Sequence, residues 1–314
     1  MGKTKFGVFL PFYAFKSQQT FERVRNVVLE CERLGFDSVW LDDHLMFGNY
    51  AFLECWTTLS ALSSITEKIR LGTMVLCTSF RNPALLAKMV ATLDLISNGR
   101  LEFGIGAGVQ KDEHEAYGIP FPKPRDRIGR MKEAVEIIKK MWTDEKANYQ
   151  GKYYTVNEAV CEPKPLQKPH PPITIGGGGE KLTLKVAAQH ADRCDWGYVP
   201  SLELYKHKLE ILENHCNDVD RDFREIEKSC WLGGQIFIGQ NRKEIDEKVL
   251  QWKPKNVSFE DFKKSSFIAT PDECRQKIRQ YAGMGVTFFM LFFGDLPDLS
   301  GLRLFVDKVV KTLN

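Results

Sequence analysis

Residues 171–192, PPITIGGGGEKLTLKVAAQHAD, contain an apolar run, four consecutive glycines and a helical pattern. The run at 172–175 predicts a buried strand, and from Glu180 onward apolar residues recur at helical spacing. Each glycine costs conformational entropy on folding, so a run of four needs a physical reason. One reason is a loose turn between strand and helix. The other is an anion that approaches the backbone closely, because N–H groups and the dipole at a helix start favour negative charge.

The same order of strand and helix repeats along the whole chain. Eight apolar runs predict strands, and each precedes a helical pattern. These runs are KFGVFLPF (5–12), DSVWLDD (37–43), IRLGTMVL (69–76), RLEFGIGAG (100–108), PITIG (172–176), DWGYV (195–199), CWLGGQIFIG (230–239) and TFFMLFFG (287–294). Most of them are continuously hydrophobic, as expected for parallel strands that are buried on both faces.

Eight strand-and-helix units in 314 residues predict a (β/α)8 barrel, the TIM barrel, with insertions and with a single domain over residues 1–314. A doubly wound open sheet is the alternative, but the GxGxxG sequence that typically follows its first strand is absent. In a barrel the active site lies at the C-terminal ends of the strands. The residues that follow each strand are therefore the candidates for function.

Composition argues against several classes of protein. With 43% hydrophobic residues, 27% charged residues and a net charge of +3, the chain gives no reason to expect nucleic acid or a membrane as partner. Eight scattered cysteines form no CxxC pair, which predicts buried free thiols in a reducing compartment. No HExxH or HxxxH pattern is present, so no metal site is expected. A cleavable signal pattern and an apolar run of about 20 residues are also absent, and the expected location is cytoplasmic.

Three ionisable residues, Asp42, Asp43 and His44, end the predicted second strand in LDDHL (41–45). A carboxylate beside an imidazole can orient the ring and adjust its proton affinity. Adjacent residues of a strand point to opposite faces, so we expect separate roles for Asp43 and His44, with proton transfer assigned to His44. The alternative is that Asp43 caps a helix while His44 lies at the surface.

Two other strand ends carry residues that suit a flat ligand. An apolar run that continues past the third strand would form a wall for a ring, unless it is simply core, and small residues after the fourth strand leave the backbone bare. These residues are Met74, Val75 and Cys77 after the third strand, and Gly106, Ala107 and Gly108 after the fourth. With the helix start after the glycine run, the set suits an extended cofactor that has a ring at one end and a phosphate at the other.

These residues together resemble the bacterial-luciferase-like oxidoreductase superfamily, and within it the branch that uses the deazaflavin coenzyme F420. The resemblance extends over nearly the whole chain. The pieces that carry it are GFDSVWLDDH (35–44), IRLGTMVLCTSFRNPALLAK (69–88), SNGRLEFGIGAG (97–108), AYGIPFP (116–122) and ITIGGGGEKLTLKVAAQHAD (173–192). It implies a (β/α)8 barrel that moves a hydride between coenzyme F420 and an organic substrate.

The resemblance also implies roles for single residues. A non-proline cis peptide bond between Met74 and Val75 would support the ring from behind. His44 would transfer the proton, and Asp43 would bind the cofactor. The apolar residues after the third strand and the small residues after the fourth strand would also contact the cofactor. The phosphate would contact the glycine run and the helix start behind it. The residues implied there are Gly176, Gly177, Gly178, Gly179, Glu180 and Lys181.

Two departures from the family argue against oxidation of a sugar phosphate. Members that oxidise glucose 6-phosphate have a tryptophan four residues beyond the histidine, where this chain has Gly48. They also have a glutamate after the glycines of the fourth strand, where this chain has Val109. The nearby acids Asp112 and Glu113 could supply polarity at the site instead, but the expectation for them is exposed carboxylates at a helix start.

Two other functions remain open on these residues. One is a monooxygenase on the same barrel that consumes reduced flavin mononucleotide (FMN) and oxygen. The other is a flavin- or deazaflavin-binding protein without catalytic activity. A short phosphate pocket would favour FMN, whereas a basic open groove would favour the polyglutamate tail of F420. The expected partners are a small organic substrate and a second copy of the chain in a homodimer.

Residues 253–269, KPKNVSFEDFKKSSFIA, interrupt the seventh unit and are polar and rich in lysine. They show little sustained periodicity, and long insertions of this kind often act as lids over active sites. The sequence therefore predicts a mobile loop near the mouth of the barrel.

Overall fold

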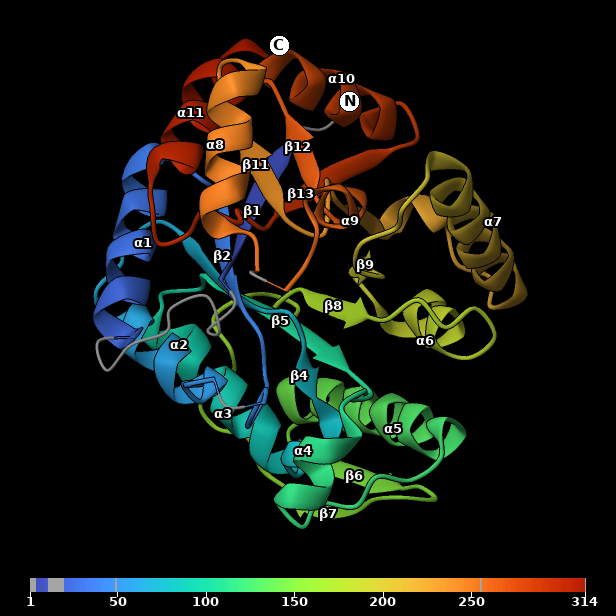
Figure 1. Ribbon diagram of the computed structural model, residues 1–314. Helices are drawn as coiled ribbons and strands as arrows, with labels where there is room; N and C mark the ends of the chain where they lie inside the picture. Colours follow the sequence, from blue (N-terminus) through green and yellow to red (C-terminus); the bar gives the residue numbers. More distant parts are fainter. Residues whose placement is uncertain (1–3, 11–19, 49, 255, 314) are drawn as a thin grey trace.

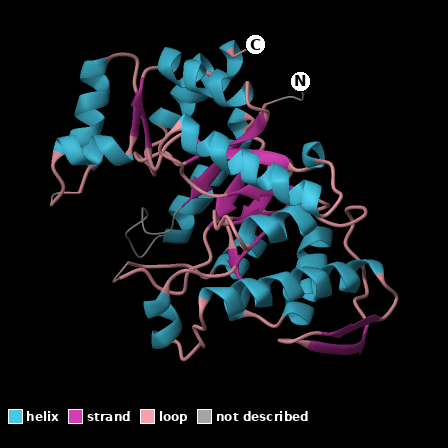
Figure 2. Cartoon of the chain, turned by 90° about the vertical axis from the view of Figure 1, so that its right-hand side faces the viewer, coloured by secondary structure: helices cyan, strands magenta, loops and turns pink. Residues whose placement is uncertain are grey.

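Parallel strands form a closed barrel in the centre of the molecule, and helices surround it (Figures 1 and 2). The computed structural model describes residues 4–10, 20–48, 50–254 and 256–313. The main sheet has nine strands in the order β3-β2-β1-β13-β10-β9-β8-β5-β4, and β3 also pairs with β5, which closes the ring. Since β3 and β4 are two pieces of one strand position, the barrel has eight positions, as predicted.

The barrel strands are short and almost wholly buried. They are β1 (Lys5–Leu10), β2 (Ser38–Leu41), β3 (Arg70–Thr73), β4 (Leu76–Cys77), β5 (Leu101–Gly106), β8 (Ile173–Gly176), β9 (Arg193–Asp195), β10 (Glu227–Trp231) and β13 (Val286–Leu291). Two further pairs stand outside the barrel, as Figure 1 shows: the antiparallel hairpin β6 (Ala147–Gln150) and β7 (Thr155–Ala159), and the parallel pair β11 (Ile236–Ile238) and β12 (Phe267–Ala269).

The helices pack apolar faces on the outside of the barrel. They are α1 (Thr20–Leu34), α2 (Cys55–Ser63), α3 (Pro83–Ile96), α4 (Lys111–Ala116), α5 (Pro124–Thr143), α6 (Thr183–His190), α7 (Leu202–Asp218), α8 (Arg242–Trp252), α9 (Phe259–Ser265), α10 (Pro271–Ala282) and α11 (Ser300–Lys308). A capping box of Thr270 and Glu273 opens α10. Within the described residues, no helix is both long and apolar enough to cross a bilayer. All eight cysteines are free and buried, as predicted.

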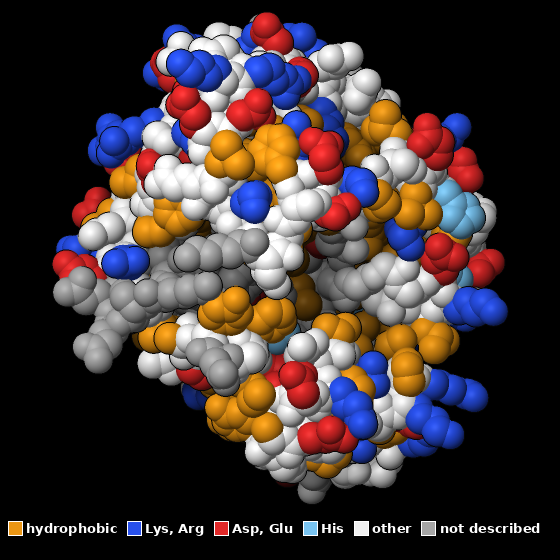
Figure 3. Space-filling model, viewed as in Figure 1, with side chains coloured by type: hydrophobic (Ala, Val, Ile, Leu, Met, Phe, Trp, Pro, Cys, Tyr) orange, Lys and Arg blue, Asp and Glu red, His pale blue; other side chains and the backbone are white. Residues whose placement is uncertain are grey.

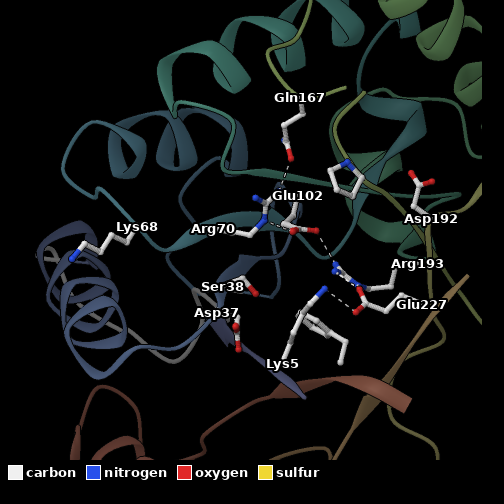
Figure 4. A pocket seen from close by; sticks show the side chains of 12 residues that line it. Lys5, Asp37, Ser38, Lys68, Arg70, Glu102, Gln167, Asp192, Arg193 and Glu227 are labelled. Atoms are coloured by element: carbon white, nitrogen blue, oxygen red, sulfur yellow. Dashed lines mark hydrogen bonds and ion pairs between the residues drawn. The ribbon is translucent and has the colours of Figure 1, made fainter. Parts of the chain in front are cut away.

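An ionic network fills the barrel at the N-terminal ends of its strands (Figure 4). The guanidinium of Arg193, on β9, lies between two carboxylates, 2.9 Å from Glu102 and 2.6 Å from Glu227. Arg70 also pairs with Glu102, and Lys5 lies 3.0 Å from Glu227. These side chains line a cavity of 580 Å³. Because the five charges of this network are already paired with one another, and because this is the N-terminal end of the barrel, we assign the network to stability rather than to ligand binding.

Trp40 separates this network from the other end of the barrel. Its side chain is fully buried, and its indole N–H donates to the hydroxyl oxygen of Ser38 at 2.8 Å. The ring lies against two strand glycines, since a Cβ added to Gly7 or Gly72 would come within 2.6 or 2.3 Å of ring atoms. Both glycines are therefore required by the bulk of Trp40 in the middle of the barrel.

Above Trp40, at the C-terminal ends of the strands, the barrel interior is apolar. The rings of Phe9 and Trp231 lie 5.0 Å apart, and those of Phe9 and Phe292 lie 5.7 Å apart. Met74, which follows β3, packs against the same cluster. This end therefore combines aromatic rings from three strands with the residues that follow β2 and β3.

Three predicted boundaries differ from the structure. The sixth barrel strand is β9 at Arg193–Asp195, not residues 195–199, because its inward side chains are charged and the apolar residues after it belong to a loop. The run at 230–239 is two strands, of which β11 leaves the barrel to pair with β12. Helix α6 begins at Thr183 rather than at Glu180, since the glycines are followed by a turn.

The prediction of a loop over residues 253–269 is wrong, because the segment contains regular secondary structure. The segment contains α9 and β12, and Phe262 on α9 is buried in a satellite cluster with Phe237, Ile245 and Val249. Strand β12 pairs with β11 in the parallel direction. The segment is thus part of a small packed layer formed by α8, α9, β11 and β12.

A buried ion pair connects this layer to the barrel. Asp295, which follows β13, is 1% exposed, and the ammonium of Lys248 on α8 lies 3.4 Å from one of its oxygens. Burial raises the pKa of Asp295 from 3.8 to about 6, although Lys248 acts in the opposite direction. The folded chain therefore holds a proton between about pH 4 and 6 that the unfolded chain releases.

We expect stability to fall as pH rises through that interval, because the raised pKa favours the protonated folded state below it. Between pH 4.5 and 7.5, wild type should lose about 2 kcal/mol of unfolding free energy relative to Asp295→Asn, which cannot titrate. Urea unfolding of both proteins at several pH values measures the difference. A difference that does not change with pH would contradict this assignment.

Candidate active site

A second cavity, of 210 Å³, lies at the C-terminal ends of β2, β3, β5 and β8. Figure 3 shows a hollow in the middle of the molecular face, with hydrophobic side chains gathered along its lower rim. The residues that line the cavity are Asp43, His44, Met74, Val75, Cys77, Gly106, Ala107, Gly108, Val109, Glu113, Gly176 and Gly177. The structure therefore brings together the residues predicted at three strand ends, together with the first two glycines of the run.

His44 is held by a carboxylate of α4, a contact that the sequence did not predict. Its Nδ1 lies 3.0 Å from Oε1 of Glu113, whose other oxygen accepts the backbone N–H of Leu45 at 3.0 Å. Glu113 is 2% exposed, so the expectation of an exposed helix-start carboxylate is wrong for Glu113, whereas Asp112 is exposed as expected. A carboxylate at Nδ1 favours the tautomer that carries its proton there and leaves Nε2 to accept one. Helix α4 makes this possible by placing Glu113 over the loop that follows β2.

Asp43 has a different partner, as expected from its opposite orientation. The guanidinium of Arg81 binds both of its oxygens, at 2.7 and 3.0 Å, and the backbone N–H of Cys77 donates to it at 2.8 Å. Burial alone would lower the pKa of Arg81. The carboxylates of Asp43 and Glu54 outweigh this effect and hold the pKa above its ordinary value. Arg81 was not predicted from the sequence. The ion pair and the hydrogen bond from Cys77 fix the end of β2 to β4.

The peptide bond between Met74 and Val75 is cis, as predicted. The side chain of Val75 lies against neighbouring strands that have glycine at the contact. A Cβ added to Gly106 or Gly176 would come within 2.5 or 2.7 Å of Val75, and one added to Gly104 would overlap the carbonyl oxygen of Thr73. The side chain of Val75 is therefore sufficient to require glycine at these positions of β5 and β8, whether or not a ligand is bound nearby.

The glycine run continues beyond the cavity as a loop toward α6. Gly177 has φ +117°, which favours glycine, whereas Gly178, Gly179, Glu180 and Lys181 lie outside the cavity lining. Among the described residues, no acceptor is recorded for the backbone N–H groups from Gly178 to Lys181. Such a series of unpaired N–H groups before a helix suits an anion.

Two basic features flank this loop. Lys208 of α7 donates to the carbonyl oxygen of Gly178 at 2.9 Å and lies 3.3 Å from Glu180, a contact that the sequence did not reveal. A groove of 310 Å³ between α5, α6 and the β6–β7 hairpin adds four cations, Arg125, Lys132, Lys152 and Lys185. Basic side chains gather in this region, at the lower right of Figure 3. The surface beyond the glycine run is therefore basic and open.

Cys77 lines the cavity as a neutral group. Burial raises the pKa of its thiol to about 11, and its sulfur lies 3.7 Å from Nε2 of His114. The Nδ1 of His114 lies 2.6 Å from the carbonyl oxygen of Gln110, which leaves Nε2 as an acceptor for the thiol. The thiol is thus a wall of the cavity rather than a nucleophile.

Comparison with known proteins gives a consistent result. The family model described as luciferase-like monooxygenase matches residues 4–264. A protein of Microbacterium testaceum described as an F420-dependent glucose-6-phosphate dehydrogenase is 37% identical over 312 residues, which cover 90% of this chain and 90% of that protein.

Two solved structures share the fold at lower identity. An F420-dependent secondary alcohol dehydrogenase, solved with an F420-acetone adduct, has a TM-score of 0.81 at 23% identity and covers 98% of this chain and 99% of its own. The oxygenating constituent of 3,6-diketocamphane monooxygenase from Pseudomonas putida, solved with FMN, has a TM-score of 0.79 at 18% identity and covers 99% of each chain. The fold alone therefore does not distinguish the two cofactors.

Proposed function

The chain belongs to the luciferase-like monooxygenase family, and from this membership we propose that it is a coenzyme F420-dependent oxidoreductase acting on a small organic substrate. Coenzyme F420 would supply a ring carbon that accepts or donates a hydride. The observation that carries the proposal is His44, fixed at Nδ1 by buried Glu113, in a cavity backed by Met74 and Val75. The identity with the dehydrogenase of Microbacterium testaceum favours F420 over FMN.

The residues of the chain fit such a cofactor along its whole length. Met74 and Val75 would support the ring, and Gly106, Ala107 and Gly108 would leave room beside it. The unpaired N–H groups after Gly177, with Lys208 close by, would hold the phosphate. The basic groove beyond them suits an acidic tail, which FMN lacks.

His44 would transfer the proton that accompanies the hydride. Its Nδ1 is occupied by Glu113, and among the described residues no hydrogen bond is recorded for Nε2, which is free to take or give a proton. Glu113 would act as a positioning residue and would stabilise the imidazolium. Asp43, bound by Arg81, would shape the cofactor site without taking part in proton transfer.

Titration with oxidised F420 tests the proposal. Saturable binding at about micromolar levels or tighter is expected, and the fluorescence of the deazaflavin measures it. Binding of FMN with equal or higher affinity, together with oxygen consumption, would instead support a flavin monooxygenase. A cofactor that binds but shows no turnover with a broad substrate panel would favour a binding protein.

Gly178→Val is expected to weaken F420 binding more than tenfold while the fold remains intact. A Cβ at this position would lie 3.2 Å from Trp196 and 3.4 Å from the ammonium of Lys208, and a branched side chain would occupy the space that the phosphate needs. Fluorescence titration measures affinity and circular dichroism measures the fold. Gly283→Val, at the end of α10, is the matched control and should bind F420 as wild type does.

We also propose that the chain forms a homodimer. Helix α3 carries Leu85, Met89 and Ile96 on one face, and Leu85 and Ile96 are 58% and 57% exposed. An apolar stripe of this kind is typical of a helix that packs against a partner. Sedimentation velocity, which gives the mass in solution, is the measurement that decides this point.

A further inference from the structure

We propose that a separate pocket, here called the Arg130 pocket, binds a small organic monocarboxylate through the guanidinium of Arg130. The pocket lies between the short helix η2 (Thr78–Phe80), the start of α3, the loop that follows α4, and α5, and it has a volume of 270 Å³. Among the described residues it shares no lining residue with the cavity assigned to F420 or with the basic groove. The inference therefore does not depend on the proposed function.

Arg130 is a cation that the protein leaves without a carboxylate partner. It is half-buried on α5, its Nε is buried without a hydrogen-bond acceptor, and no ion pair is recorded for it among the described residues. The carboxylate one turn further along the helix, that of Glu133, accepts the backbone N–H groups of residues 152–154 instead. A guanidinium that lines a cavity and lacks a partner within the protein favours an anion from solution.

Aromatic rings and neutral donors surround this guanidinium. The rings of Tyr153 and Tyr154 lie 5.0 and 5.9 Å from its central carbon and support it. Burial raises the pKa of Tyr154, although Arg130 acts in the opposite direction, so the hydroxyl keeps its proton and can donate to a bound anion. The side-chain oxygen of Asn82 accepts two backbone N–H groups of α3, which leaves its NH2 group as a further donor.

The charges around the pocket match a ligand with one negative charge. The second guanidinium of the lining, that of Arg81, is already bound by Asp43 and Glu54. Among the described residues the lining itself contains no carboxylate, so only Arg130 remains to be balanced. A monocarboxylate supplies a single charge in the planar form that a guanidinium binds through two hydrogen bonds. Phosphate is less suitable, because it carries a second charge once it loses a further proton near neutral pH.

The remainder of the pocket is suited to an apolar body. Its walls there are Phe80, Ile119, Pro120 and Pro122. The ring of Phe80 is held by the imidazole of His114, since the two ring centroids lie 5.0 Å apart. A volume of 270 Å³ is small for a ligand pocket, so the occupant is an acid with a short chain or a single ring rather than a nucleotide.

Calorimetry of the purified protein with benzoate, benzamide and inorganic phosphate tests this site. Benzoate is expected to bind saturably, with one molecule per chain and a Kd of about 1 mM or lower. Benzamide has the same shape without the charge, and phosphate lacks the apolar body, so each should bind at least about tenfold more weakly. Saturation with F420 should leave benzoate binding in place, because the two sites have different linings.

Variants locate the binding site. Arg130→Gln should weaken benzoate binding by at least about tenfold, with the fold checked by circular dichroism. Tyr154→Phe, which keeps the ring and removes one donor, should weaken it by about threefold or more. Arg224→Gln is the matched control and should bind benzoate as wild type does, because that side chain is 87% exposed and far from any cavity lining described above.

Several outcomes would contradict the proposal. Absence of saturable benzoate binding to wild type, or unchanged affinity in Arg130→Gln, would overturn the site. Loss of benzoate binding on saturation with F420 would place benzoate in the cofactor cavity and would also overturn it. Benzamide or phosphate that binds as tightly as benzoate would overturn the ligand class. If Arg130→Gln does not fold, wild-type affinity of Tyr154→Phe is the result that overturns the site.

Discussion

His44→Ala is expected to reduce turnover by about 10²–10⁴-fold, because the variant lacks the group that transfers the proton. The affinity for F420 should change by less than about tenfold, since the glycine run, Lys208 and the Met74–Val75 wall remain in place. Turnover is followed at 420 nm once a substrate is known, and affinity by fluorescence titration. His170→Ala, at the opposite end of the barrel before β8, is the matched control and should leave both unchanged.

Glu113→Gln distinguishes positioning from proton transfer. The amide can still accept a hydrogen bond from Nδ1 of His44 but no longer stabilises the imidazolium, so turnover should fall less than in His44→Ala and its pH profile should shift. The assignment of His44 fails if His44→Ala turns over at the wild-type rate. It also fails if the loss in His44→Ala is one of F420 affinity, as expected for Gly178→Val.

Arg193→Leu should lower the free energy of unfolding by about 3–5 kcal/mol, the largest effect on stability that we expect. The substitution leaves the carboxylates of Glu102 and Glu227 inside the barrel without their central cation. Chemical denaturation measures the loss. Arg224→Leu is the control, because that side chain is 87% exposed and its pair with Asp222 is screened by water, so no measurable loss is expected.

A double substitution isolates the ionic contribution. Glu102→Gln added to Arg193→Leu removes one of the stranded charges and should recover part of the stability lost in the single variant. A double variant that is less stable than Arg193→Leu by the full cost of Glu102→Gln alone would show that the two residues act independently. That result would contradict the network.

The sequence predicts the barrel well because most strands are short apolar runs between clear helical patterns. It misplaces the sixth strand because Arg193 and Asp195 point into the barrel, where the ionic network and Trp231 satisfy them. An inward-facing charge resembles a surface charge until its partner from another strand is known. The layer of α9 and β12 was missed for a related reason, since Phe262 is buried by residues of α8 and β11 rather than by its own neighbours.

The same limit applies to the site. Asp43 and His44 could be found because they directly follow a buried strand, and the cis bond followed from the family resemblance. Arg81, Glu113 and Lys208 could not, since each acts on a partner about 30 to 70 positions away. Glu113 in particular lies in KDEHEA, whose charge is typical of an exposed helix turn, and only the packing of α4 over the β2 loop buries it.

Trp40 makes the two ends of the barrel separable for protein engineering. Its ring fills the interior between the ionic network and the aromatic cluster of Phe9, Trp231 and Phe292, with Gly7 and Gly72 leaving room for it. Substitutions below this ring, such as those that rebuild the charges around Arg193, are expected to act additively with substitutions above it at Phe9, because among the described residues no hydrogen bond or ion pair joins the side chain of Phe9 to the network. A library for new substrates can thus be made on a stabilised parent without testing every combination.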